Sequence, residues 1–349
     1  MSRRDWILGI IVSLGGAATA IAAAGSAAAD SRRAHISHTL LPTVYEVGHF
    51  YATPQLHDGR RLRLLVDTGG TGGSGWWVID PIAAERLGFR VSKCAWGDSS
   101  FDVIKTVEYR PGKGLPPSPQ TPCDSSTLLV KGVATQLDHA DGMLGAGYLP
   151  GHIWTFDYPQ KQLWLEPPSW RADAGMHQVK LGFMRNAAGN KGSGMARIQI
   201  MVDGQPLDML LDTGATAKPT AAGIEATRIE TKHGIGVISY ITSGVMDRWH
   251  RDHPNWRMVR DGDNIFGAHA ATRLIEVPRL TIAGWQVGPV WFTERSDATF
   301  HNYMSAYMDQ PIEGVVGANV FEHFVMTVNY PADRAWFACV KGCRSVGSD

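Results

Sequence analysis

The sequence lacks an excess of charge of either sign. Its 33 Lys and Arg residues balance its 33 Asp and Glu residues, and only 19% of the chain is charged. Proteins that bind nucleic acid or an anionic surface through electrostatics normally carry a basic excess. The composition therefore predicts no nucleic-acid partner. Intrinsic disorder is not indicated either, because 44% of the residues are hydrophobic.

Cysteine is scarce, with four residues in a chain of 349. No Cys-x2-Cys pair is present and the 13 histidines are scattered, so the sequence predicts no metal site. Four cysteines fit a disulfide-bonded protein in an oxidising compartment. The spacing favours one local bridge in each half, Cys94–Cys123 and Cys339–Cys343, although four cysteines allow three pairings.

Long uncharged runs are also missing, except for one near the start of the chain. Arg3 and Arg4 precede residues 6–25, which hold no charge and are rich in Ala, Gly, Ile and Leu. Three alanines follow at 27–29, as in a cleavable export signal, and the paired arginines resemble the twin-arginine type. We therefore expect residues 1–29 to be a signal peptide and the mature protein to be periplasmic or secreted. The alternative is an uncleaved membrane anchor, since 20 uncharged residues can just span a bilayer.

Glycine and proline, in contrast, are plentiful, and they separate short apolar runs. Such punctuation is typical of a β-rich protein with many turns. A chain of 349 residues is long enough for two packed lobes.

The most informative feature is an internal duplication. The apolar run at 62–66, LRLLV, leads into Asp-Thr-Gly at 67–69. The apolar run at 207–211, LDMLL, leads into Asp-Thr-Gly at 212–214. Each reads as a short strand that feeds a turn, with the second strand preceded by a clear hairpin signal.

A second block repeats further along the chain. Residues 141–165 and 313–337 align without gaps at an offset of 172 and share seven identities. The identical pairs are Gly142/Gly314, Gly145/Gly317, Ala146/Ala318, Thr155/Thr327, Tyr158/Tyr330, Pro159/Pro331 and Trp164/Trp336. The Asp-Thr-Gly turns are offset by only 145, so the second half carries 27 more residues between its two blocks. The duplication predicts an N-terminal lobe at 30–175 and a similar C-terminal lobe at 176–349.

These motifs resemble those of the aspartic peptidases, both pepsin-like and retropepsin-like. The signature of that family is an apolar strand, Asp-Thr-Gly, and a later apolar-apolar-Gly segment. Here it is present as LLVDTGGT with GMLG and as MLLDTGAT with GVVG. The resemblance implies a mainly β, bilobal acid-protease fold, with two pseudo-two-fold related, β-barrel-like lobes and few short helices. It also implies a complete site in one monomeric chain, without a metal or organic cofactor.

The resemblance assigns the catalytic pair to Asp67 and Asp212. Two carboxylates within hydrogen-bonding range cannot both ionise, so the pair holds one proton over a wide pH range. The ionised member activates a shared water for attack on a peptide carbonyl, and the protonated member donates to the developing oxyanion. The expected substrate is an extended polypeptide, held along the cleft like an added strand.

Supporting roles follow from the same resemblance for residues in and after the two turns. Thr68 and Thr213 are expected to cross-link the turns through hydrogen bonds from hydroxyl to backbone. Gly69 and Gly214 are expected to let backbone N–H groups approach the carboxylates closely, where a Cβ would obstruct.

The resemblance also assigns roles to residues further from the pair. Thr71 and Thr216 are expected to donate hydroxyls to the outer carboxylate oxygens. Tyr109 and Tyr240 are candidates for the flap that closes over a substrate. The polar and aromatic segment 250–269 reads as an insertion without a counterpart in the first half.

Two other functions stay open. A pseudo-peptidase would bind peptides without cutting them. The glycine-rich run 69–75, with Gly70 in place of the more usual Ser, Thr or Ala, would favour that function if it distorted the first turn. An envelope scaffold protein would be anchored by residues 6–25 and would work through the 250–269 segment.

Overall fold

The computed structural model describes residues 38–70, 77–96, 98–104, 107–117, 128–132, 139–267 and 270–346. The expected signal peptide at 1–29 lies outside these ranges, as do Thr71 and Cys123. Residues 36–349 group into one compact unit. Among the described residues, no helix has both the length and the apolar character needed to cross a bilayer.

The described chain is mainly β, with four short α-helices. The strands of the first half are β1 (Thr39–Leu40), β2 (Thr43–Glu46), β3 (His49–Ala52), β4 (Leu64–Val66), β5 (Trp77–Ile79), β6 (Ser92–Trp96), β7 (Ser99–Ile104), β8 (Leu128–Val130), β9 (Gly142–Leu144), β10 (Ile153–Asp157) and β11 (Gln162–Glu166). Those of the second half are β12 (His177–Lys180), β13 (Arg197–Val202), β14 (Gln205–Leu211), β15 (Thr216–Ala217), β16 (Gly236–Val237), β17 (Ser239–Thr242), β18 (Met258–Asp263), β19 (Thr272–Val277), β20 (Leu280–Ile282), β21 (Trp285–Val287), β22 (Val290–Arg295), β23 (Gly314–Val316), β24 (Phe324–Asn329), β25 (Arg334–Cys339) and β26 (Cys343–Ser345). The helices are α1 (Pro81–Arg86), α2 (Ala221–Thr227), α3 (Ser243–Asp252) and α4 (Ala318–Phe321), with π-helical and 3-10 turns at Thr299–Tyr303 and Met304–Tyr307.

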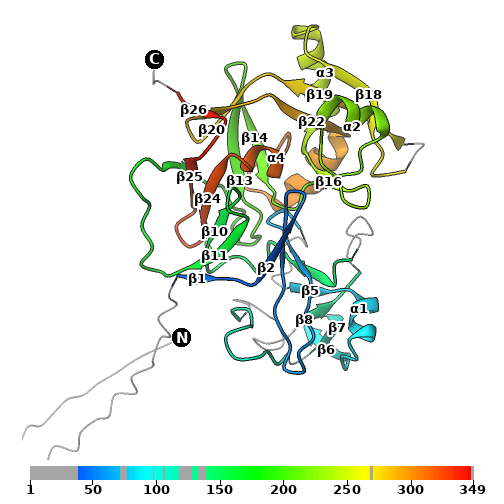
Figure 1. Cartoon of the computed structure of the whole chain (residues 1–349), viewed down its shortest axis with the longest axis vertical. Coiled ribbons are helices and arrows are strands. Elements are labelled where there is room, and N and C mark those ends of the chain that lie inside the picture. The colour runs from blue at the N-terminus through cyan, green and yellow to red at the C-terminus, as the bar shows by residue number, and fades with distance from the viewer. Residues whose placement is uncertain are drawn as a thin grey trace, which may run out of the picture. The chain divides into compact units, whose positions relative to one another are not determined.

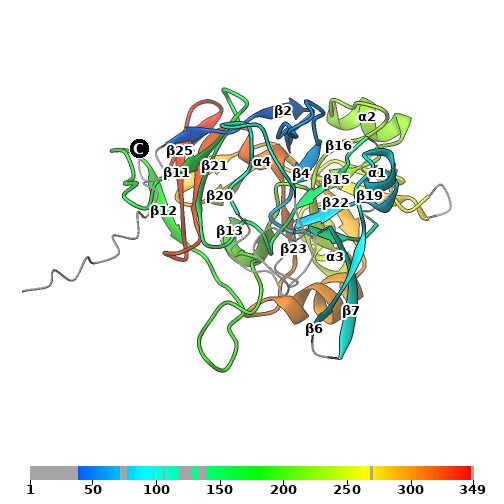
Figure 2. The same ribbon diagram turned by 90° about the horizontal axis from the view of Figure 1, so that it is seen from below.

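Three large sheets organise these strands. The first half forms an eight-stranded sheet, β2-β3-β4-β9-β5-β8-β7-β6, and the second a ten-stranded sheet, β18-β19-β22-β17-β23-β14-β13-β20-β21-β26. Both halves contribute to a six-stranded sheet, β1-β11-β10-β24-β25-β12. Figure 1 shows the blue-to-cyan strands of the first half apart from the yellow and orange strands of the second, and Figure 2 gives the orthogonal view. The mainly β, bilobal fold expected from the repeats is confirmed.

Local sequence explains where several elements begin and turn. Asp80 caps α1 by accepting a hydrogen bond from the Ile82 N–H at 2.9 Å, with Pro81 in the first turn. Asp203 and Gly204 have φ values of 50° and 74° between β13 and β14, as a two-residue hairpin turn requires.

The shared sheet reveals the symmetry of the repeat. β10 and β24 pair antiparallel at its centre, with Thr155 directly opposite Thr327. These two threonines are also equivalent positions of the duplicated block, and their hydroxyl oxygens lie 2.8 Å apart. Equivalent residues meet each other in this way when a two-fold axis relates them. The pseudo-two-fold axis therefore passes through this pair.

The strand pairing also shows which segments of the two halves correspond. β4 pairs parallel with β9 as β14 does with β23, and β5 lies against β9 as β17 lies against β23. The β6–β7 and β18–β19 hairpins then occupy equivalent sheet edges. Residues 250–263 include the end of α3 and all of β18, and β18 corresponds to β6 of the first half. The prediction that the segment 250–269 has no counterpart is therefore wrong.

The additional residues of the second half lie elsewhere. β5 begins at Trp77, ten residues after Asp67, whereas β17 begins at Ser239, 27 residues after Asp212. The segment 216–238, with β15, α2 and β16, therefore contains most of the additional residues. It follows the second Asp-Thr-Gly turn directly.

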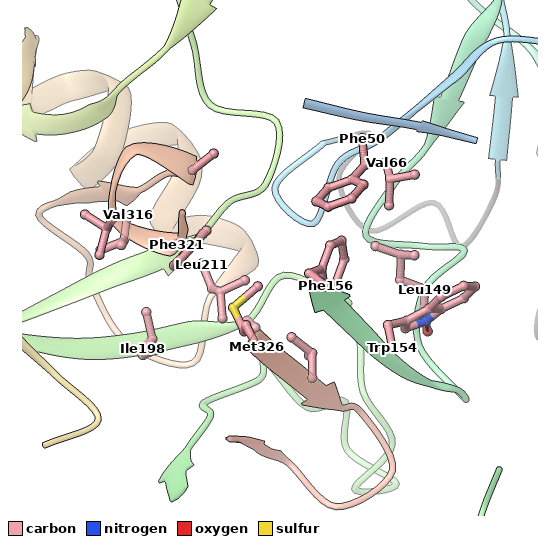
Figure 3. Packing of buried hydrophobic residues seen from close by; sticks show 14 of the residues in the cluster. Phe50, Val66, Leu149, Trp154, Phe156, Ile198, Leu211, Val316, Phe321 and Met326 are labelled. Atoms are coloured by element: carbon pink, nitrogen blue, oxygen red, sulfur yellow. Dashed lines mark hydrogen bonds between the residues drawn. The ribbon is translucent and has the colours of Figure 1, made fainter. Parts of the chain in front are cut away.

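Buried apolar residues from both halves form one continuous core cluster. Figure 3 shows Phe50, Val66 and Phe156 of the first half together with Leu211 and Met326 of the second. Val66 and Leu211 are fully buried and immediately precede the two Asp-Thr-Gly turns. Close packing therefore fixes the base of both turns.

One expected disulfide is present within the described residues, between Cys339 and Cys343. Cys94 is also disulfide-bonded, and its expected partner, Cys123, lies outside the described residues. The boundary expected near residue 175 falls between β11 and β12, two strands of the shared sheet.

Candidate active site

The two Asp-Thr-Gly turns meet at the junction of the halves. Asp67 and Asp212 are 7% and 8% exposed, and each carboxyl group lies against the glycine of the other turn, Asp67 against Gly214 and Asp212 against Gly69. Each backbone N–H donates to the last residue of the neighbouring parallel strand: Asp67 to the Leu144 carbonyl and Asp212 to the Val316 carbonyl, both at 3.0 Å. The apolar-apolar-Gly segments of the repeat therefore anchor the aspartates.

Thr68 and Thr213 connect the turns through reciprocal hydrogen bonds. The Thr68 hydroxyl donates to the Leu211 carbonyl at 2.7 Å and accepts from the Thr213 N–H at 3.0 Å. The Thr213 hydroxyl donates to the Val66 carbonyl at 2.7 Å and accepts from the Thr68 N–H at 3.2 Å. Both threonines are fully buried, so these bonds satisfy backbone groups that water cannot reach.

Gly69 and Gly214 each lie between the carboxylate of their own turn and the carboxylate of the other turn. The Gly69 N–H donates to Asp67 Oδ1 at 2.9 Å, and the Gly214 N–H donates to Asp212 Oδ1 at 2.8 Å. A Cβ at Gly69 would lie 2.5 Å from Cγ of Asp212, and one at Gly214 would overlap the carboxyl group of Asp67. Only glycine therefore allows the carboxyl groups to come so close.

Burial and proximity shift the acidity of the pair. Burial raises the pKa of the Asp67 carboxyl, although hydrogen bonds from Asp212 and from the turn's backbone N–H groups oppose the rise. Burial also raises the pKa of Asp212 well above its usual value, and the charge of the Asp67 carboxylate raises it further. Two such carboxyls retain a shared proton to higher pH than an exposed aspartate would.

Thr216 has a different role from the expected one. Its hydroxyl donates to the Gly214 carbonyl at 2.7 Å instead of to a carboxylate oxygen. The side chain thus braces the turn that holds Asp212, because the carbonyl two residues earlier is the nearer acceptor. Its counterpart, Thr71, lies outside the described residues.

The two candidate flap tyrosines are not part of a flap. Tyr240 lies in β17 between β22 and β23, and its hydroxyl bonds the backbone of Thr216. Tyr109 forms a single bridge with Leu56 and packs against the core. Their apolar rings gain more from burial than from a place at a hairpin tip.

His49 is a neighbour of the site that the sequence did not indicate. It is fully buried in β3, and its Nε2 lies 3.2 Å from Oγ1 of Thr216. Burial lowers the pKa of the imidazole to about 4, so the side chain is neutral at pH 7. A lone histidine in an apolar strand carries no sequence signal of its partner, which is 167 residues away.

The surroundings of Gly70 explain why this residue departs from the usual motif. A Cβ at this position would lie 2.7 Å from Cγ of Asp67 and 2.5 Å from Sδ of Met143. Met143 fills the space that a side chain after the first Asp-Thr-Gly would need. The residue is therefore matched to its surroundings, and the described part of this turn is not distorted.

The chemistry available is that of two buried, proton-sharing carboxyl groups. Among the described residues, no group of three His, Cys, Asp or Glu side chains could hold a metal ion. A water bound between the carboxyls would contact one group that can accept its proton and one that can donate.

Comparisons with known proteins add a likeness of fold. No protein-family model and no curated protein matches the chain. Its structure is similar to the crystal structure of an aspartic proteinase from Irpex lacteus, with a TM-score of 0.48 and 11% identity, covering 88% of this chain and 98% of that chain.

Proposed function

We propose that the protein is an aspartic-type endopeptidase that hydrolyses peptide bonds through a water activated by Asp67 and Asp212. The observation that carries this proposal is the reciprocal bonding of Thr68 and Thr213 around two buried, mutually adjacent carboxyls. Burying two acidic groups side by side opposes folding. Such an arrangement is expected where chemistry requires it.

The reaction follows from one proton shared by two carboxyls. The ionised carboxylate accepts a proton from the water, whose oxygen forms a bond to the peptide carbonyl carbon. The protonated carboxyl donates its proton to the carbonyl oxygen, which gives a neutral tetrahedral intermediate. The carboxyl that took the water's proton then gives it to the nitrogen, while the other, now ionised, takes a proton from a hydroxyl of the intermediate, so the C–N bond breaks and the amine leaves.

The proposed substrate is an extended polypeptide. A chain in this conformation can add to a sheet edge through backbone hydrogen bonds, which suits a mainly β protein. We also propose that the protein acts as a monomer outside the cytoplasm, either released or anchored by residues 6–25. The Cys339–Cys343 disulfide supports an oxidising compartment.

The test is digestion of a mixed peptide library between pH 3 and pH 8 by the wild type, Asp67→Asn and Asp212→Asn. We expect internal cleavage by the wild type and loss of cleavage in both variants, because each removes half of the shared-proton pair. Lys180→Ala, an exposed substitution in β12 at the edge of the shared sheet, serves as the control. A folded wild type that cuts nothing at any pH, or a variant that cuts as well as the wild type, would contradict the proposal.

A further inference from the structure

A buried ion pair lies in the second half of the chain, close to the turn of Asp212. Arg295, at the end of β22, donates from Nη2 to Oδ2 of Asp263 at 2.9 Å, and the two side chains are 4% and 0% exposed. The same carboxylate accepts hydrogen bonds from the Lys218 N–H at 2.9 Å and from the Thr293 hydroxyl at 3.2 Å. A buried pair with its remaining lone pairs satisfied is a rigid feature, because separating it would leave uncompensated charge.

The ion pair holds an aromatic side chain in place. The guanidinium of Arg295 lies over the ring of Tyr240, 4.3 Å from its centroid. Tyr240 is also fixed through its backbone, since β17 pairs with β22 on one side and with β23 on the other. Its ring therefore has little freedom to move.

The hydroxyl of Tyr240 binds the backbone beyond the second Asp-Thr-Gly turn. It accepts from the Thr216 N–H and donates to the Thr216 carbonyl, both at 2.5 Å. The Thr216 hydroxyl in turn donates to the Gly214 carbonyl at 2.7 Å, and the Gly214 N–H donates to Asp212 Oδ1 at 2.8 Å. A short series of hydrogen bonds thus connects the phenol to the carboxylate.

We propose that Tyr240 is a positioning residue for Asp212, and that the Asp263–Arg295 pair holds Tyr240 in that role. This inference rests on the proposed peptidase function and deepens it. The first half has no equivalent phenol, since the strand pairing places Val78 where Tyr240 stands in the second. The segment 216–238 begins two residues after the second Asp-Thr-Gly turn, and the Tyr240 hydroxyl connects its first residue, Thr216, to the sheet.

The first test is kinetic and uses Tyr240→Phe, which removes one hydroxyl and keeps the ring. We expect kcat to fall by about 10-fold to 100-fold, because small displacements of a reacting group are costly. KM should stay within about twofold, since a positioning residue does not touch the substrate. Arg295→Lys, which keeps the charge, should retain more activity than Arg295→Met.

A matched control is available on neighbouring strands. Arg273 of β19 forms an ion pair with Glu294 of β22, the residue beside Arg295, and is partly exposed. Arg273→Met removes an arginine–glutamate ion pair from the same sheet without affecting Tyr240. We expect it to leave kcat unchanged, and an equal loss in Arg273→Met and Tyr240→Phe would mean that general loosening of the sheet is the cause, which overturns the positioning role.

The second test needs no substrate. The titration of the Asp67 and Asp212 carboxyls can be followed by NMR in protein labelled with 13C at aspartate. Loosening the turn should weaken the Gly214 hydrogen bond to Asp212, so the pKa of the pair should rise in Tyr240→Phe. An unchanged titration overturns the positioning role. A wild type that cuts nothing, with a titration that still shifts in the variant, overturns the peptidase and leaves the positioning role in place.

Discussion

The two halves of the molecule support equivalent aspartates in different ways. Their contact at the centre is symmetric: the paired hydrogen bonds of Thr68 and Thr213, and those of Gly69 and Gly214, differ by at most 0.2 Å between halves. Each aspartate is also anchored by the same kind of parallel strand. The symmetric part is therefore the part that sets the distance between the carboxyls.

The surroundings are not symmetric. Tyr240 occupies the position of Val78, and by strand register the buried His49 of the first half is equivalent to Met195 of the second. Tyr240 and His49 both contact Thr216, so two polar side chains converge on the second turn. A duplicated motif can therefore keep its central geometry while each copy acquires its own support.

The largest effect should come from breaking the symmetric contact itself. Thr68→Val or Thr213→Val leaves one buried carbonyl and one buried N–H without a partner, at a cost of about 1–3 kcal/mol each. We expect either variant to lose about 4 kcal/mol of unfolding free energy in urea titrations, together with any peptidase activity. Thr→Ser variants, which keep the hydroxyl, are the controls. Unequal losses in the two threonine variants would show that the contact is not energetically symmetric.

The next effect concerns His49 and depends on pH. The folded pKa of about 4 lies below the value of about 6.5 for an unfolded histidine. The unfolded state therefore binds the proton first as pH falls, so stability is full above pH 6.5 and is lost towards pH 4. The loss at pH 4 should be about 3 kcal/mol.

His49→Met introduces the residue of the equivalent position and removes this dependence. At pH 7 the variant should be less stable by about 1 kcal/mol, because the contact with Thr216 is lost. At pH 4 it should be the more stable protein. Thermal unfolding of wild type and His49→Met at pH 7 and pH 4 checks this reversal in the order of stability. A stability difference of the same sign and size at both pH values would refute it.

A smaller effect is expected from the aspartates themselves. Burial raises the pKa of Asp67 and Asp212 above the unfolded value, so the folded state releases its shared proton at a higher pH than the unfolded state does. Stability is thus greatest below the unfolded pKa of about 3.9 and falls as pH rises. Asp212→Asn should raise the free energy of unfolding at pH 7 by about 1–2 kcal/mol, because removing an unfavourably buried acidic group usually stabilises a protein by about that amount. The gain should shrink below pH 4, and a loss at pH 7 in both asparagine variants would contradict this account.

Local and repeated features of the site were predictable from sequence. The Asp-Thr-Gly turns, their cross-linking threonines and the glycines obey strict steric rules over a few residues, and the duplication supplied an internal check. The hairpin at Asp203-Gly204 follows from equally local chemistry.

Features that depend on register were not predictable. The role of Tyr240 requires knowing that β17 follows an insertion and lies beside the turn, and position along the chain suggested a flap instead. The polar composition of 250–269 suggested an insertion, whereas the inserted segment, 216–238, has an ordinary composition. His49 gave no signal, because its partner comes from the other half of the chain.

The smallest effect tests whether the symmetry extends beneath the site. Tyr158 and Tyr330 are equivalent residues of the repeat, 2% and 1% exposed, and neither hydroxyl has a hydrogen-bond partner among the described residues. Removing a buried hydroxyl that makes no hydrogen bond costs nothing and relieves its desolvation. Tyr158→Phe and Tyr330→Phe should therefore each change the unfolding free energy by less than about 0.5 kcal/mol, or stabilise the protein.

The two phenylalanine variants should also agree with each other, since both tyrosines follow the paired strands β10 and β24 at the centre of the shared sheet. Urea unfolding at pH 7 measures both. A loss of about 1 kcal/mol in both variants would mean that each hydroxyl is hydrogen-bonded, with bridging water as the available partner. A loss in only one would mean that the symmetry of the shared sheet ends before these residues, and that the asymmetry seen around Thr216 begins in the core.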